Sequence, residues 1–235
     1  MGLELPPKLT QNQLYASGNR EASRKLTLET TVYCFDLILL LGLPAIVVMN
    51  KLMHLWLVEV PEYAVTFTQW IIIRNIISTF SASLYIPMMA ANKIRSNSIA
   101  AVFLGIGEFV ILYILLRIGF GPMWIQYMGV LLALSFGLII KPYILYKEID
   151  YPLKDLCQCY WICTKVVLVA LLPTMCCILF LEDTLLCNII KALISAVGVA
   201  LSSYIFLKQT AKSKLRVAIT RSIDSIRKMT FNNYN

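Results

Sequence analysis

Six long apolar runs restrict what this chain can fold into. A helix needs about 20 mainly apolar residues to cross the roughly 30 Å hydrocarbon core of a bilayer. Six segments meet that length, namely residues 31–50, 67–91, 98–116, 123–146, 160–181 and 185–207. The runs are continuous rather than alternating, which argues against a membrane β-barrel. The sequence therefore predicts an all-α membrane protein with six transmembrane helices.

The composition agrees with a chain whose solvent is mostly lipid. Of 235 residues, 59% are hydrophobic and 14% are charged, whereas soluble domains average roughly 45–50% and about 25%. A soluble globule of this size cannot hide so much apolar surface from water. These values exclude secreted soluble, disordered and nucleic-acid-binding proteins, so no nucleic acid is expected as a partner despite the net charge of +8.

The basic residues predict how the spans are oriented. Sixteen Lys and Arg residues lie in the leading segment, in the second and fourth connections and in the tail, whereas the opposite connections hold two, Lys51 and Arg117. An excess of Lys and Arg marks the cytoplasmic side of a membrane protein. We therefore expect a multi-pass protein of the plasma membrane with both termini in the cytoplasm.

Residue patterns for catalysis or metal binding are scarce in this sequence. His54 is the only histidine, and no nucleophile elbow, P-loop or dinucleotide fingerprint is present. Cys157, Cys159 and Cys163 come closest to a metal cluster, but they lack the paired spacing and the His partners of zinc sites. The sequence predicts no catalytic residue, no metal and no cofactor. We expect a protein that is not an enzyme.

Three ionisable residues, Asp36, Arg74 and Glu108, lie well within predicted spans. Such residues are costly in lipid, so they normally face a bundle interior or a wet cavity. At about 1.5 Å per residue, Arg74 lies roughly 7 Å to the outer side of its span centre, and Glu108 lies near the centre of the next span. Asp36 lies roughly 7 Å to the cytoplasmic side of centre, where we expect headgroups and water to reach it.

Arg74 begins a polar stripe on the second span. Arg74, Ser78, Ser81 and Tyr85 recur at helical spacing on one face, as side chains that line an aqueous cavity do. An Arg in that position can bind a phosphate through several donors. The residues leave two alternatives open, a structural ion pair between Arg74 and Glu108 and a role for Glu108 in relaying protons or sodium ions.

Three stretches resemble a known family. They are residues 7–10 with 15–19, residues 55–63 and residues 90–94. The second reads LWLVEVPEY and is similar to the family's external loop LWLG-x-VPEY, with Val58 in place of Gly. The third resembles the turn A-x-G-K-I, with Asn92 in place of Gly, a residue that also tolerates a left-handed backbone. In order and spacing, residues 6–155 resemble the bacterial polysaccharide flippases of the multidrug/oligosaccharidyl-lipid/polysaccharide superfamily.

This resemblance implies both a fold and an activity. The family members flip lipid-linked precursors of O-antigen, lipopolysaccharide, capsule or teichoic acid across the bacterial inner membrane. They consist of two helical bundles, and the present chain resembles the C-terminal one, so it is expected to be a truncated or half transporter. The implied partners are an oligosaccharide on a polyprenyl pyrophosphate carrier, membrane lipids, and a separate N-terminal half or glycan-assembly proteins.

The chain divides into three predicted parts. Residues 1–155 form the flippase-like part with four spans, residues 156–207 add a two-span hairpin, and residues 208–235 form a basic tail whose apolar spacing predicts an amphipathic helix on the inner leaflet. One alternative function is a non-transporting membrane subunit of a glycan-assembly complex. Another is a membrane glycan polymerase or acyltransferase, which would need clustered His, Asp or Arg in external loops that are short here.

Overall fold

The computed structural model describes residues 15, 18–182 and 184–206, and it is helical throughout that part of the chain except for short connections. Six helices are long and apolar enough to cross a membrane, which confirms the predicted all-α architecture with six spans. The elements are α2 (Arg20–Trp56), α3 (Ala64–Ala90), α4 (Arg95–Ile118), α5 (Trp124–Leu134), the π-helix η1 (Ser135–Ile140), α6 (Lys141–Ile149), α7 (Leu153–Phe180) and α8 (Leu185–Phe206). The helix predicted for residues 208–235 lies outside the described residues.

The first helix is longer than the sequence predicts. The apolar run covers residues 31–50, whereas α2 has 37 residues and, at about 1.5 Å per residue, measures about 55 Å. Asn19 caps it by accepting a hydrogen bond from the Ala22 amide at 3.2 Å. Arg24 then pairs with Asp155 of α7 at 3.4 Å. The length of an apolar run predicts only the part of a helix that lies in lipid. It therefore does not predict the polar turns of α2 that precede residue 31.

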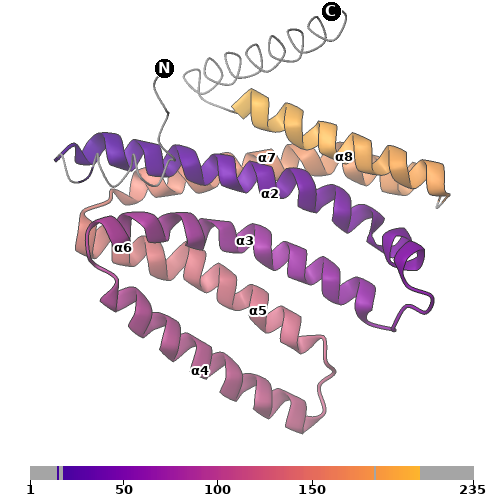
Figure 1. Ribbon diagram of the computed structural model, residues 1–235, viewed down its shortest axis with the longest axis horizontal. Helices are drawn as coiled ribbons and strands as arrows, with labels where there is room; N and C mark the ends of the chain where they lie inside the picture. The colour runs from indigo at the N-terminus through magenta and orange to yellow at the C-terminus, as the bar shows by residue number, and fades with distance from the viewer. Residues whose placement is uncertain (1–14, 16–17, 183, 207–235) are drawn as a thin grey trace, which may run out of the picture.

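Helices α2 and α3 pack side by side and form the middle of the bundle (Figure 1). The hairpin of α7 and α8 packs on α2, and the fourth span, made of α5, η1 and α6, packs on α3. Helix α4 lies at the edge and packs mainly against α5. None of its most apolar 18-residue stretch is buried within the described chain, so lipid or another protein must cover most of α4.

Two clusters of buried side chains hold the helices together. The first joins α2, α3, α7 and α8 through Phe35, Leu39, Leu43, Ile76, Phe80, Cys163, Val166, Ala170 and Val199. The second joins α3, α6 and α7 through Leu84, Met88, Ile144, Leu145, Tyr151 and Leu156. Small residues let the helices approach closely, as in other membrane bundles. At Gly42, for example, a Cβ would lie 3.0 Å from Ile72 and from Ile76 of α3.

The fourth span contains a π-helix that the sequence does not predict. The sequence predicts a transmembrane helix over residues 123–146, and within it residues Ser135–Ile140 have π-helical hydrogen bonding. The Gly137 carbonyl accepts a hydrogen bond at 2.7 Å from the Tyr160 hydroxyl of α7. The ring of Tyr160 also packs edge-on against Phe80 of α3, with centroids 5.0 Å apart. The π-helix therefore has a tertiary partner, and π-helices occur frequently at functional sites.

Among the described residues, two turns contain a residue other than glycine with positive φ. Asn92 between α3 and α4 has a φ of 53°, which agrees with the expectation that it tolerates a left-handed backbone. Asp150 between α6 and α7 has a φ of 58°. Asn and Asp adopt this conformation more readily than other residues with side chains. Both turns lie at the end of the bundle where α2 begins.

Candidate functional site

Arg74 lies on α3 with its side chain stretched across α5. A Cβ at Gly129 of α5 would lie 2.9 Å from Nη1 of Arg74 and 3.1 Å from its Cδ. The absence of a side chain at Gly129 therefore makes room for the Arg74 side chain at this interface. Among the described residues, Arg74 makes no hydrogen bond, ion pair or ring contact. Its guanidinium is half-buried within a span and has all its donors free for a ligand.

Glu108 does not pair with Arg74 in this structure. The described part of the chain contains one ion pair, between Arg24 and Asp155. Helix α4 packs mainly against α5, so Glu108 is not brought to α3. Its half-exposed carboxylate lies on the helix that has the least protein around it.

The remaining residues of the predicted stripe are all half-buried on α3. Two of them lie beside a buried cation whose position the sequence does not predict. The Lys141 ammonium donates a hydrogen bond to the Ser81 carbonyl and lies 5.2 Å from the ring centroid of Tyr85. The ring centroid of Phe136 of η1 lies 5.4 Å from the same ammonium. No hydrogen bond or ring contact is found for Ser78 among the described residues.

The count of basic residues includes Lys141 among the cytoplasmic cations around the fourth connection, but its side chain is only 5% exposed. It is the first residue of α6, directly after the π-helix. A carbonyl and two aromatic faces offset part of the cost of removing an ammonium group from water. Lys141-Pro142 at the end of an apolar run is the sequence signal for a cation at this position. This signal does not show the direction in which the Lys141 side chain points.

Asp36 is not at the solvated boundary where we expected it. It is 7% exposed, and both carboxylate oxygens are buried without a hydrogen-bond donor in the described chain. Its side chain lies close to Ser203 of α8, whose hydroxyl is also buried and unpaired. The expectation was wrong because α8 packs over this part of α2 and excludes water. A carboxylate in such surroundings is stable when it binds a proton or a cation.

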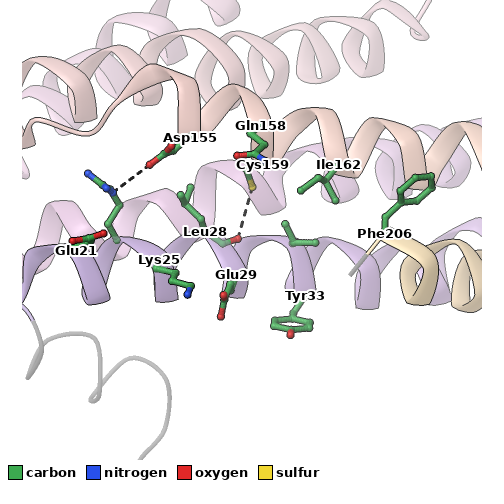
Figure 2. A pocket seen from close by; sticks show the side chains of 12 residues that line it. Glu21, Lys25, Leu28, Glu29, Tyr33, Asp155, Gln158, Cys159, Ile162 and Phe206 are labelled. Carbon is green, nitrogen blue, oxygen red and sulfur yellow. Dashed lines mark hydrogen bonds and ion pairs between the residues drawn. The ribbon is translucent and has the colours of Figure 1, made fainter. Parts of the chain in front are cut away.

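A groove opens between α2 and α7 beside the end of α8 (Figure 2). Its volume is about 230 Å³. Polar and charged side chains lie toward the start of α2, and apolar ones lie toward the middle of the helices, ending at Phe206. The Arg24–Asp155 pair joins the two helices at the polar end. The Cys159 thiol donates to the Leu28 carbonyl at 3.8 Å and joins them a turn further on.

No group of three or more His, Cys, Asp or Glu side chains in the described residues could hold a metal ion. The seven cysteines are free thiols, and Cys159 and Cys163 are buried between helices.

No protein-family model, curated protein or solved structure matches this chain. The fold defines it as a multi-pass membrane protein with an all-α bundle of six spans. Function must therefore be inferred from the charged groups within that bundle and from the resemblance of the short motifs.

Proposed function

We propose that this chain takes part in flipping a lipid-linked oligosaccharide or polysaccharide precursor across the bacterial inner membrane, as a truncated or half transporter. In this proposal both termini lie in the cytoplasm, and the substrate belongs to the O-antigen or capsule type. The observation that carries it is the free guanidinium of Arg74 inside a span, pressed against Gly129. The motif resemblance points to the same activity.

The chemistry of such a substrate suits a cation row, which we define as Arg74 of α3 and Lys141 of α6. The pyrophosphate of the carrier needs positive charge to leave water, while the polyprenyl tail can remain in lipid. Arg74 offers several donors in the fork geometry that suits phosphate oxygens. Lys141 is already bonded to Ser81, so it adds positive charge without needing to move. Flipping breaks no covalent bond, so the proposal does not make the chain an enzyme.

Substitution of Arg74 tests this proposal. Arg74→Ala should reduce the fraction of labelled lipid-linked oligosaccharide that reaches the outer face of cells by about tenfold or more, because the phosphate loses its charged partner. Arg74→Lys should retain part of the transport, since it keeps the charge. Arg95→Ala is the matched control, because Arg95 is exposed at the start of α4. Equal export by the wild type and Arg74→Ala would refute a contact between Arg74 and the substrate.

Exchanging the charges of Arg74 and Glu108 distinguishes two roles for Arg74. One is contact with the substrate phosphate, and the other is a structural ion pair with Glu108 that forms in another state of the transporter. If Arg74 and Glu108 only stabilise each other, the double variant Arg74→Glu/Glu108→Arg should recover much of the export that Arg74→Glu loses. If Arg74 binds the substrate phosphate, the double variant should remain as inactive as Arg74→Glu.

A second candidate is a non-transporting membrane subunit of a glycan-assembly complex. The observation that favours it is α4, whose apolar stretch is unburied within the described chain. A photo-reactive amino acid at Phe103 or Phe109, which are 72% and 73% exposed, would then crosslink to one membrane protein in cells. Crosslinks to lipid would favour the transporter proposal, in which α4 needs no protein partner.

A further inference from the structure

We propose that the groove between α2 and α7 binds one zwitterionic phospholipid whose headgroup carries a phosphate, a primary ammonium and no further charge, that is, phosphatidylethanolamine. This inference concerns a site apart from the cation row and does not depend on the proposed transport. It rests on the shape of the groove, on the free groups at its rim and on the balance of its charges.

The groove has the polarity of a lipid that lies at a membrane boundary. Its polar end is formed by turns of α2 that precede the apolar run starting at residue 31. Its other end is lined by Val32, Ile162 and Phe206, which belong to spans. A headgroup at the polar end would therefore be level with the headgroups of the surrounding leaflet, and the start of an acyl chain would pack on the apolar end.

Glu29 and Lys25 at the rim both lack partners within the described residues. The Oε1 atom of Glu29 is buried and has no hydrogen-bond donor, which is costly unless a ligand supplies one. Lys25, one turn earlier on the same face of α2, is exposed and forms no ion pair. Arg24 is already paired with Asp155. Glu21, one turn before Lys25, also lines the groove and forms no ion pair within the described residues. Glu29 thus offers a buried acceptor, and Lys25 offers a cation roughly 6 Å away along the helix axis.

This arrangement selects among headgroups. A primary ammonium can donate to Glu29 while the phosphate, two carbons away, faces Lys25. A choline headgroup has no N–H to donate. A glycerol headgroup leaves the lipid anionic, and the groove, with Glu21, Glu29 and Asp155 against Arg24 and Lys25, carries more negative than positive charge. Phosphatidylethanolamine is therefore expected to bind more tightly than phosphatidylcholine or phosphatidylglycerol.

Native mass spectrometry of the full chain in detergent tests this inference. Titration with the three lipids, matched in acyl chains, should give phosphatidylethanolamine adducts at several-fold lower lipid concentration than the other two. Glu29→Gln and Lys25→Gln should each weaken that binding by about tenfold, because each removes one charge-assisted contact. Glu62→Gln and Lys93→Gln are the matched controls, since both residues are exposed in connections away from the groove, and they should leave binding unchanged.

Three results would overturn the inference. Phosphatidylglycerol or phosphatidylcholine could bind as tightly as phosphatidylethanolamine, or Glu29→Gln could behave like Glu62→Gln. Phosphatidylethanolamine could also bind only after residues 208–235 are deleted, which would show that the tail occupies the groove. Ile162→Trp provides a variant that leaves the charges intact. It should fill the apolar end and abolish the adducts while the thermal unfolding midpoint stays near that of the wild type.

Discussion

Arg74 keeps its position because the residue opposite it on α5 has no side chain. Gly129→Ala would place a Cβ 2.9 Å from Nη1, and the flexible guanidinium would have to move away. We expect a several-fold loss of export with no loss of stability, because Gly→Ala within a helix itself stabilises by up to about 1 kcal/mol. Export and thermal unfolding in detergent measure the two effects.

The control for this prediction is Gly105→Ala on α4, where an added Cβ would meet nothing within 4 Å. It should leave export unchanged and be slightly stabilising. If both variants export as well as the wild type, the position of the Arg74 guanidinium does not matter for transport.

Tyr151 joins the turn between α6 and α7 to the start of α2. Its hydroxyl lies 3.2 Å from the Thr27 hydroxyl, which itself donates to the Ser23 carbonyl, so Tyr151 is the donor. Burial raises the pKa of Tyr151 above its ordinary value. Tyr151→Phe should therefore lower the free energy of unfolding by about 1 kcal/mol at neutral pH.

The pH dependence of that difference follows from the direction of the shift. The folded protein holds the Tyr151 proton more tightly than the unfolded chain, whose tyrosine ionises near pH 10. The stabilisation by Tyr151 is fully present below pH 10 and decreases as the pH rises above it. Unfolding of both proteins at pH 7 and above pH 10 checks this, and a difference that widens at high pH would contradict it.

Among the elements, η1 depends most on a neighbour. The Gly137 carbonyl accepts its side-chain hydrogen bond from Tyr160 of α7. Tyr160→Phe leaves this carbonyl without that donor, so we expect a loss of about 1–3 kcal/mol and a lower unfolding midpoint. Tyr146→Phe is the matched control because Tyr146 is 52% exposed. Equal midpoints for the two variants would show that the π-helix does not need Tyr160.

The sequence predicts the spans well but their interruptions poorly. Length and hydropathy determine which segments lie in lipid, so all six spans were found. Helix ends outside lipid depend on partners, such as Asp155 for Arg24. The π-helix depends on Tyr160, and the burial of Asp36 depends on α8. The position of Arg74 within a span could be predicted from depth, but its contact with Gly129 depends on how α3 and α5 pack.

At the scale of the whole molecule, α3 and α7 connect the two buried clusters because each contributes side chains to both. Six crossings place the connections alternately on two faces. The turns at Lys93 and Asp150 share the face where α2 begins, and those at Glu62 and Gly121 share the other. The excess of Lys and Arg predicts that the first face is cytoplasmic.

Cysteine labelling in intact cells tests that orientation, in a background where the seven free cysteines are replaced by Ala. A membrane-impermeant maleimide should label Glu62→Cys and Gly121→Cys directly, but Lys93→Cys and Asp150→Cys only after permeabilisation. Labelling on the same side for all four would contradict the six-span arrangement. The reverse pattern would show that the bundle is inverted and that the α2–α7 groove lies in the outer leaflet. The cytoplasmic orientation argued from Lys and Arg would then be wrong.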